Sequence, residues 1–361
     1  MSRESLMARA LLLAERGVFT TAPNPRVGCV IAKNELILAE GWHRRAGQAH
    51  AEVNALMQLN QKEAKGADCY ITLEPCCHDG RTPPCSDAII KAGIKRVIIA
   101  MKDPNPQVAG RGIEKLKQAG IEVILGVLEE QAEKLNQGFC QRMRLGRPYI
   151  RSKLAMSVDG KTAMASGESQ WITSQDARQD VQKLRAQSSA ILTGIGTVLT
   201  DDPRLSVRPE GWYPEGEVVR QPLRIVIDSN LRTPLKAKIF NSEAETLIVS
   251  IKPSDKKRVN PMVIESDRGH VDLKKLMIRL AEREINDVMV EAGAKLNGAL
   301  IQAGLIDELV IYMAPKLLGD SAQGLFHLPA LQKMSQNIAL NIGDIRPVGT
   351  DWRITAYPVY G

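Results

Sequence analysis

Short apolar runs alternate with amphipathic stretches along the first 130 residues of the chain. The apolar runs have the pattern of buried or half-buried strands, and they cover residues 26–33, 36–41, 68–73, 95–101 and 121–127. Between them apolar residues recur at helical spacing, which predicts helices over 2–16, 50–64, 85–93 and 110–119. Because strands and helices alternate, we expect an α/β layer with a largely parallel sheet.

The polar stretch 137–148 interrupts this alternation. It contains Gly146 and Pro148, which are typical of connections between domains. Beyond it the pattern predicts a helix over 174–187, a loop over 194–205, and strands over 149–156, 189–193, 223–227, 246–250, 287–291, 308–313, 338–346 and 352–359. We therefore predict two α/β domains, 1–146 and 147–361, the second with enough strands for one large sheet.

Composition places the chain among ordinary globular proteins. Of 361 residues, 44% are hydrophobic and 25% charged, which excludes fibrous and disordered classes. No run of 18 uncharged apolar residues occurs, so we expect no membrane-spanning helix. Glu4 and Glu15 lie within the apolar N-terminal segment, which we interpret as an amphipathic helix rather than a signal peptide. We expect a cytoplasmic protein.

The charge distribution argues against a nucleic-acid partner. The net charge is +7, but residues after 147 carry 27 Lys and Arg against 25 Asp and Glu. Aromatic residues make up only 4% and do not interleave with basic clusters. An enzyme acting on RNA or DNA, whose second half would be a nucleic-acid module, would need a more basic second half. We expect neither a nucleic-acid nor a membrane partner.

All six cysteines fall within the first 140 residues, at positions 29, 69, 76, 77, 85 and 140. A cytoplasmic chain keeps its thiols reduced, so a disulfide framework is not expected. A local cluster of three cysteines near a histidine and a glutamate indicates a metal site instead.

His50, Cys76 and Cys85 supply the ligand set of a catalytic zinc ion, which needs three protein ligands and one open position. Cys85 opens a predicted helix, whose dipole favours a thiolate. Glu52 lies two residues from His50, near enough to move protons at the metal without binding it. This arrangement is that of zinc deaminases, with an H-x-E motif and a proline before the first cysteine.

Two alternatives remain open at this point. Eight residues separate Cys76 from Cys85 where the deaminase pattern has two, so Cys77 can replace Cys76 as the ligand. We prefer Cys76 because it follows the proline directly. The other alternative is a closed structural site, in a noncatalytic zinc-binding protein, with His78 or Cys77 as fourth ligand. Such a site has no use for Glu52.

The segments HAE (50–52) and TLEPCCHDGRTPPC (72–85) resemble the deaminase half of the bifunctional riboflavin-biosynthesis deaminase/reductases. That family has the long insert between its two zinc cysteines. The resemblance extends to TAPNPRVG (21–28) and KDPNP (102–106), which line the deaminase pocket in the family. It implies substrate contacts from Asn24, His43, Arg81, Asp103 and Asn105. Turn chemistry alone accounts equally well for Asp103 and Asn105.

The second half contains no G-x-G-x-x-G fingerprint after a strand, so a Rossmann site is not supported. Residues 194–197 (GIGT) follow a strand, but a plain turn explains them equally well. Residues 290–299 give a stronger signal, because a buried strand ends at Glu291 and a Gly-containing loop leads into a helix. The first N–H groups of such a helix suit an anion such as a cofactor pyrophosphate, and Lys295 can assist.

The family resemblance covers this half as well. It implies a reductase domain similar in fold to dihydrofolate reductase, with NADPH bound across the sheet edge. The implied cofactor contacts are Ala155, Trp171, Thr197, Asp201, Ser229, Gly293, Ala294, Lys295, Leu296, Asn297, Gly298 and Ala299. The implied substrate contacts are Ser169, Arg185, Leu205, Arg208 and Glu291. Both arginines suit a sugar phosphate, whereas Ser169 and Glu291 suit ribose hydroxyls.

The resemblance thus implies two successive reactions on one phosphorylated pyrimidine. The cytidine-deaminase-like domain, with one Zn²⁺ per chain and Glu52 as proton carrier, removes the 2-amino group of 2,5-diamino-6-ribosylamino-4(3H)-pyrimidinone 5′-phosphate. The dihydrofolate-reductase-like domain then uses NADPH to reduce the ribosyl group to ribityl. The sequence does not identify a proton donor among the side chains of the second half. We also expect a homo-oligomer, either a dimer or a tetramer.

Overall fold

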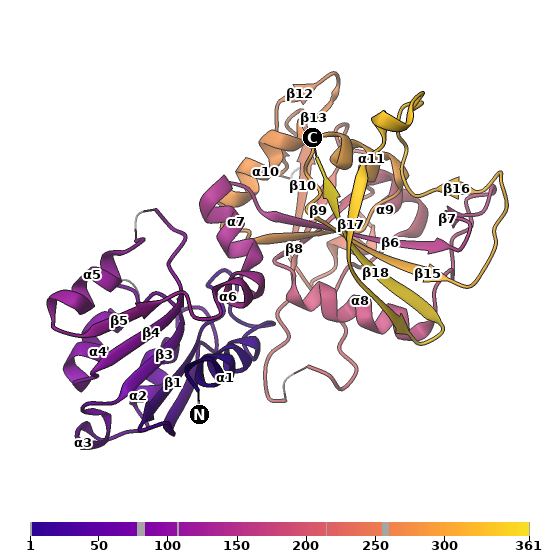
Figure 1. Ribbon diagram of the computed structural model, residues 1–361. Coiled ribbons are helices and arrows are strands. Elements are labelled where there is room, and N and C mark those ends of the chain that lie inside the picture. The colour runs from indigo at the N-terminus through magenta and orange to yellow at the C-terminus, as the bar shows by residue number, and fades with distance from the viewer. Residues whose placement is uncertain (1, 78–83, 107, 214, 255–259, 361) are drawn as a thin grey trace. The chain divides into compact units, whose positions relative to one another are not determined.

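The computed structural model describes residues 2–77, 84–106, 108–213, 215–254 and 260–360. The chain divides into two compact units, Met1–Arg147 and Pro148–Gly361, which are considered separately below (Figure 1). Among the described residues, no helix combines the length and apolarity needed to cross a membrane.

The first unit is built on a five-stranded sheet in the order β2-β1-β3-β4-β5. Its strands are β1 (Gly28–Lys33), β2 (Leu36–Trp42), β3 (Asp68–Leu73), β4 (Arg96–Met101) and β5 (Glu122–Leu125). The expectation of a largely parallel sheet is only half met, because β1 pairs antiparallel with both β2 and β3. Asn34 and Glu35 form the β1–β2 turn with φ of 49° and 65°, and a two-residue turn of this kind reverses the chain.

Helices cover both faces of this sheet and make a three-layer unit. They are α1 (Arg3–Glu15), α2 (Ala51–Leu56), α3 (Gln61–Ala64), α4 (Cys85–Ala92), α5 (Arg111–Gln118), α6 (Glu129–Leu135) and α7 (Gln137–Leu145). One core joins α1, α6 and α7 to the sheet, for example through Leu6, Ala132 and Cys140. The other joins α2, α4 and α5 to the opposite face, through residues such as Ala55 and Ile89.

Two predicted elements of this unit differ from the structure. The helix expected over 50–64 is broken, because the Asn60 side chain accepts hydrogen bonds from the backbone N–H groups of Lys62 and Glu63 and starts α3 anew. The polar stretch expected to be a linker is mostly α7, which buries Cys140 and ends at Gly146 in the left-handed conformation.

The second unit contains the large sheet that the sequence predicts. Its nine strands lie in the order β11-β10-β9-β8-β14-β6-β15-β18-β17 (Figure 1). The neighbours from β11 to β15 are parallel, and β18 and β17 add an antiparallel hairpin at the edge. The strands are β6 (Tyr149–Ser157), β8 (Ala190–Gly194), β9 (Leu223–Ile227), β10 (Thr246–Ser250), β11 (Met262–Val263), β14 (Asp287–Val290), β15 (Glu308–Ala314), β17 (Ala339–Val348) and β18 (Asp351–Val359).

Two short strand pairs and four α-helices complete the described part of this unit. The pairs are β7 (Lys161–Ala163) with β16 (Gln323–Gly324), and β12 (Ser266–Asp267) with β13 (His270–Val271). The helices are α8 (Gln175–Gln187), α9 (Ile195–Asp201), α10 (Leu273–Glu282) and α11 (Ala294–Gln302), with 3₁₀ turns at Lys238–Phe240 and Met334–Gln336. The loop expected over 194–205 therefore contains a helix, α9, which buries Val198 against the sheet.

The parallel strands place several loop starts at one edge of the sheet. The carboxyl ends of β6, β8, β9 and β14 all lie there, and β14 is inserted between β6 and β8. From this point the chain runs outward in one direction through β9, β10 and β11, and in the other through β15. Ligands of open α/β sheets bind at such reversals of strand order.

Candidate functional site

Three metal-ligating side chains meet in the first unit. His50 immediately precedes α2, Cys76 follows β3, and Cys85 is the first residue of α4. The His50 Nδ1 atom lies 3.2 Å from the Cys85 Sγ and 3.6 Å from the Cys76 Sγ. All three ligand atoms fall within 4.8 Å of one another, and this is the one such group in the described part of the chain. Cys77 is described and is not part of it, whereas the predicted alternatives at His78 and the contact at Arg81 lie outside the described residues.

The donor set has the chemistry that zinc prefers. Hydrogen bonds from the Cys85 thiol, from His50 and from the Cys85 backbone N–H lower the pKa of the Cys76 thiol to about 4. The same hydrogen bond between the two thiols raises the pKa of Cys85. A preformed thiolate beside an imidazole and a second thiol fits a tetrahedral zinc site with one open position.

Glu52 is buried beside this group, with 3% of its surface exposed. It lies in the first turn of α2, two residues after His50. Burial raises the pKa of the Glu52 carboxyl to about 7. A carboxyl with a pKa near neutrality can both take up and return a proton, which is the requirement for a general acid–base group.

Two of the predicted substrate contacts adjoin the metal group. The His43 ring packs edge-on against the His50 ring, with 5.2 Å between centroids. His43 Nδ1 lies 3.2 Å from the Ala49 carbonyl, so this nitrogen carries the proton. Its Nε2 then accepts a hydrogen bond from the Asn24 amide at 3.1 Å. Burial lowers the pKa of His43, so the neutral ring fixes the orientation of Asn24.

Asp103 and Asn105 lie on the segment between β4 and α5. The Asp103 carboxylate accepts a hydrogen bond from the Asn105 backbone N–H at 2.8 Å, which is the turn chemistry that the alternative interpretation expects. The Asp103 N–H in turn donates to the carboxylate of Glu74, a residue next to Pro75 and Cys76. The sequence motif contains Glu74, but the pattern gave it no role.

In the second unit, several predicted cofactor contacts follow strands that end at the shared carboxyl edge. Thr197 lies in α9 after β8, Ser229 follows β9, and residues 293–299 follow β14, while Ala155 lies near the end of β6. The segments after β8 and β14 lie side by side, because the Thr193 hydroxyl donates to the Glu291 carbonyl at 2.7 Å. Helix α11 begins after Gly293, which is exposed, so its first N–H groups can donate hydrogen bonds to an anion.

Two residues of the 293–299 segment serve the packing of α11. The Asn297 side chain is fully buried, donates to the Ala292 carbonyl at 2.7 Å and accepts from the Ser152 hydroxyl at 2.6 Å. A Cβ atom at Gly298 would lie 2.1 Å from the His327 carbonyl oxygen, so only glycine fits there. These side-chain positions point into the fold and hold the helix N-terminus in place.

The predicted phosphate-binding Arg185 is paired with Glu291. Its Nε and Nη2 donate to the two carboxylate oxygens at 2.6 and 2.9 Å, and both side chains are only 12% exposed. The guanidinium fork expected for a phosphate is therefore occupied by a carboxylate. Although burial favours its protonated form, Arg185, Lys153 and Arg208 hold the pKa of Glu291 below its usual value. Lys153 is a cation of this cluster that the sequence pattern did not single out.

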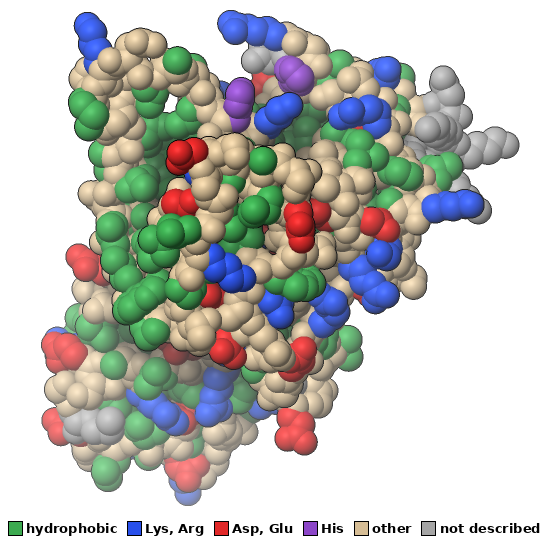
Figure 2. All heavy atoms as spheres, turned by 90° about the vertical axis from the view of Figure 1, so that its right-hand side faces the viewer, with side chains coloured by type: hydrophobic (Ala, Val, Ile, Leu, Met, Phe, Trp, Pro, Cys, Tyr) green, Lys and Arg blue, Asp and Glu red, His purple; other side chains and the backbone are tan. Residues whose placement is uncertain are grey.

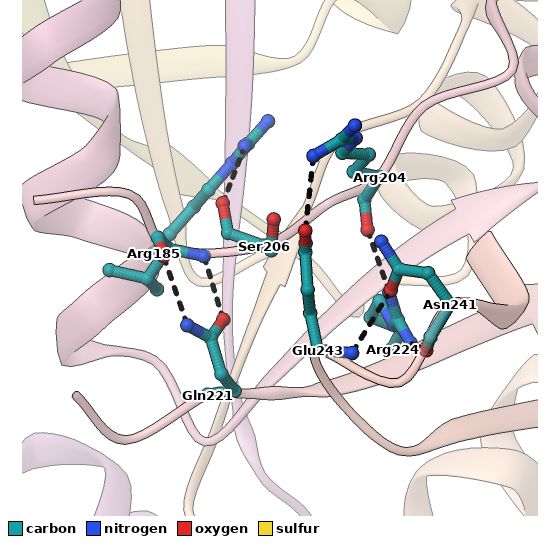
Figure 3. A network of polar contacts seen from close by, with 8 residues as sticks. Arg185, Arg204, Ser206, Gln221, Arg224, Asn241 and Glu243 are labelled. Carbon is teal, nitrogen blue, oxygen red and sulfur yellow. Dashed lines mark hydrogen bonds and ion pairs between the residues drawn. The ribbon is translucent and has the colours of Figure 1, made fainter. Parts of the chain in front are cut away.

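The segment that carries Leu205 and Arg208 is fixed by a polar network (Figure 3). Arg185 Nη1 donates to the Ser206 carbonyl at 3.1 Å, and the fully buried Arg224 donates to the Arg204 carbonyl at the same distance. Leu205 is only 3% exposed, its backbone adopts the left-handed conformation, and its side chain packs in the core of the unit. The Arg208 side chain is exposed.

The remaining predicted contacts lie toward the surface. Trp171 is 65% exposed and stacks under the Arg178 guanidinium at 4.6 Å. Its carbonyl accepts a hydrogen bond from Lys316 at 2.8 Å, and Ser169 precedes it by two residues. Asp201 is the last residue of α9, and burial raises the pKa of its carboxyl.

Comparison with known proteins assigns each unit a counterpart. Residues 1–101 match the cytidine and deoxycytidylate deaminase zinc-binding region, and residues 148–354 match the RibD C-terminal domain. The riboflavin biosynthesis protein RibD of Escherichia coli K12 is 54% identical, covering 97% of this chain and 98% of the relative. The protein of the same name from Haemophilus influenzae is 50% identical, covering 98% and 96%.

Solved structures give the same correspondence over both units. RibD of Acinetobacter baumannii superposes with a TM-score of 0.93 at 46% identity, covering 99% of each chain. A diaminohydroxyphosphoribosylaminopyrimidine deaminase/5-amino-6-(5-phosphoribosylamino)uracil reductase from Thermotoga maritima superposes with a TM-score of 0.85 at 33% identity, covering 99% and 98%.

Proposed function

The chain belongs to the RibD family of riboflavin-biosynthesis enzymes, and on this premise we propose which residues perform each of its two reactions. It is a bifunctional deaminase and reductase that uses zinc and NADPH. The predicted fold class is also confirmed, with a cytidine-deaminase-like unit followed by a dihydrofolate-reductase-like unit.

For the deamination we assign the metal to His50, Cys76 and Cys85. Bound zinc supplies Lewis-acid chemistry that makes water nucleophilic near neutral pH. Glu52 takes a proton from the water that attacks the pyrimidine carbon bearing the 2-amino group. It returns this proton to the ring nitrogen and then carries the proton of the newly added hydroxyl to the departing amine. The carbonyl forms as the carbon–nitrogen bond breaks, and ammonia leaves. The observation that supports this role is the burial of Glu52 two residues from His50, with its pKa near 7.

Recognition of the pyrimidine falls in this proposal to Asn24, His43, Asp103 and Asn105. The hydrogen bond from Asn24 to His43 leaves the Asn24 carbonyl oxygen as an acceptor for a ring N–H or amino group. Arg81 is proposed as a further substrate contact, as the family resemblance implies.

For the reduction we assign the cofactor to the carboxyl edge of the second sheet. NADPH supplies the hydride that opens the ribosyl group at C1′. The proposed cofactor contacts are Ala155, Trp171, Thr197, Asp201, Ser229 and the segment 293–299. The backbone N–H groups at the start of α11 suit its pyrophosphate, with Asn297 and Gly298 acting through the position of the helix.

The proposed substrate contacts of the second unit are Ser169, Arg185, Leu205, Arg208 and Glu291. The ion pair between Arg185 and Glu291 changes the roles that we propose for them. Arg185 keeps Glu291 ionised, so the carboxylate can accept hydrogen bonds from ribose hydroxyls. The exposed Arg208 then becomes the main cation for the phosphate. Ser169 remains a partner for a hydroxyl, and the buried Leu205 acts by holding the segment that carries Arg208.

The substitution Glu52→Gln tests the deaminase assignment. It keeps the shape of the side chain and removes its capacity to carry a proton. Ammonia release should fall by at least ~10²-fold, the usual scale for a lost acid–base group, while zinc content stays at one per chain. An active, zinc-loaded variant would contradict the role of Glu52.

We also propose that the enzyme is a homodimer formed through the β17–β18 hairpin. One face of this hairpin is apolar, because the paired positions are Leu340 with Pro358, Ile342 with Ala356, Ile345 with Ile354 and Pro347 with Trp352. Its β18 half packs against the core of the unit through Ala356 and Ile354, whereas its β17 half is exposed. Ile342 is 61% exposed and Ile345 52%, and β17 is the last strand of its sheet. Hydrophobic side chains gather along the left-hand margin of the view in Figure 2. Exposed apolar faces of this kind mark protein interfaces.

A second copy of the chain fits this edge by its charges. Antiparallel pairing of two β17 strands about Ile345 places Asp344 opposite Arg346 of the second copy, in both directions. Light scattering should give twice the chain mass for the native enzyme and one chain mass for Ile342→Asp. The control Val218→Asp, at a site that is 74% exposed, should remain dimeric. A monomeric native enzyme would refute the proposal.

We place the enzyme in the cytoplasm, where its six free thiols stay reduced.

A further inference from the structure

A buried carboxylate organises the segment beside the metal group. Glu74 follows β3 and precedes Pro75 and Cys76, and only 3% of its surface is exposed. Its backbone N–H donates to the Met101 carbonyl at 3.0 Å, which ties it to the end of β4. The side chain therefore lies between a metal-ligand segment and the segment that leads from β4 to α5.

The Glu74 carboxylate accepts four hydrogen bonds, all from backbone N–H groups. Oε2 accepts from Asp103 at 3.1 Å and from Gly110 at 2.9 Å. Oε1 accepts from Gly112 at 3.0 Å and from Ile113 at 3.2 Å. Gly112 and Ile113 lie in the first turn of α5, whose unpaired N–H groups and helix dipole both favour a negative charge.

The two segments also touch directly. A Cβ atom at Gly112 would lie 2.0 Å from the Pro75 carbonyl oxygen, so the start of α5 packs against the peptide next to Cys76. Glu74 holds one end of this segment at Asp103 and the other at Gly110, and Asn105 lies between them, bound to the Asp103 carboxylate by a hydrogen bond of 2.8 Å. One carboxylate thus fixes both ends of the segment that carries two proposed substrate contacts.

We propose that Glu74 is a positioning residue for the deamination, which holds Asp103 and Asn105 where the pyrimidine binds beside the metal. This inference rests on the proposed function, because it needs Asp103 and Asn105 to contact the substrate. The role depends on a carboxylate in particular. A glutamine of the same shape has one acceptor oxygen, and its NH₂ group would face two N–H donors.

The test is Glu74→Gln in the full chain, assayed for zinc content, ammonia release and NADPH oxidation on the deaminated substrate. We expect one zinc per chain, unchanged NADPH oxidation, and a KM for deamination raised at least ~10-fold, or ~1.4 kcal/mol, with kcat within a few-fold. The matched control is Glu63→Gln, since the exposed Glu63 also accepts a backbone N–H, from Asn60 at 2.9 Å. Glu63→Gln should change neither the KM for deamination nor the rate of NADPH oxidation.

A double-mutant comparison separates this inference from the proposed function. If Glu74 acts through Asp103 and Asn105, then Glu74→Gln should add little to the KM of the double variant Asp103→Ala/Asn105→Ala. An unchanged KM in that double variant would refute the substrate contacts, whereas additive effects would refute the positioning role. A zinc-loaded Glu74→Gln variant with unchanged KM, or with only kcat reduced, would also overturn it. Should that variant lose zinc or fail to fold, the charge-conserving Glu74→Asp decides by the same KM measurement.

Discussion

Removal of the Arg185 guanidinium should destabilise the second unit strongly. The pair with Glu291 is bidentate, with distances of 2.6 and 2.9 Å, and both side chains are 12% exposed. The substitution Arg185→Met keeps the apolar stem of the side chain and removes the charged group. It therefore leaves a buried carboxylate without its main partner. Breaking a buried pair from one side costs about 3–5 kcal/mol. Because Lys153 and Arg208 still stabilise the charge, we expect the lower end, about 3 kcal/mol at pH 7.

The matched control is a pair of the same type at the surface. Arg204 lies 3.0 Å from Glu243, and the two side chains are 52% and 37% exposed. Solvent screens such a pair, so Arg204→Ala should cost less than about 1 kcal/mol. Urea unfolding followed by tryptophan fluorescence measures both, since three of the four tryptophans, at positions 171, 212 and 352, lie in the second unit.

The pH dependence gives this prediction its sign. Glu291 has a pKa below its ordinary value of 4.5 in the folded protein, so its pair contributes fully above about pH 4.5 and is lost as the pH falls through the lowered pKa. The stability difference between the native protein and Arg185→Met should therefore shrink below pH 4.5. A cost below 1 kcal/mol at pH 7, or a difference that is the same at pH 7 and pH 4, would refute the reasoning.

Two further predictions concern the assigned ligands and the phosphate. Metal analysis should show zinc lost from Cys76→Ser and retained in Cys77→Ser, because only Cys76 lies in the group with His50 and Cys85; the reverse pattern would overturn the assignment. Arg208→Ala should raise the KM of the reductase with little change in kcat, and should leave ammonia release unaltered, because a phosphate contact is made equally in ground and transition states. A loss of kcat at unchanged KM would instead place Arg208 at the reacting centre.

The metal group could be predicted from sequence because each ligand lies at the end of a predictable element. His50 and Cys85 both stand at the start of periodic apolar segments, and the first unit places these helix starts beside the end of β3. The clustering of loop starts at the carboxyl edge of the second sheet could be predicted for a similar reason, since parallel strands align the loops that follow them.

Contacts between distant residues could not be predicted in the same way. Glu291 lies 106 positions from Arg185, and no local pattern distinguishes an arginine bound by a carboxylate from one awaiting a phosphate. Glu74 lies inside a recognised motif, but its four donors come 29 to 39 positions later. Only the fold brings these groups together.

Of the remaining differences, the break in the expected helix 50–64 had a local signal that the hydrophobic pattern does not weigh, whereas the other two had none. Asn60 followed by Glu63 is a capping box, and it breaks the expected helix 50–64. The turn at Asn34 and Glu35 has no glycine to mark the positive φ that both residues adopt. In α7 the buried Cys140 lies among polar residues, so the segment has the composition of a linker while it packs as a helix.

The most direct test of the two-site account is NADPH oxidation by the Glu52→Gln variant supplied with the already deaminated ribosylamino-pyrimidinedione phosphate. We assign deamination to the metal group of the first unit and hydride transfer to the carboxyl edge of the sheet in the second. NADPH oxidation should therefore proceed at a rate near that of the native enzyme, although the same sample releases almost no ammonia from the diamino substrate. Loss of both activities in a folded, zinc-loaded variant would contradict separate sites and require a single shared one.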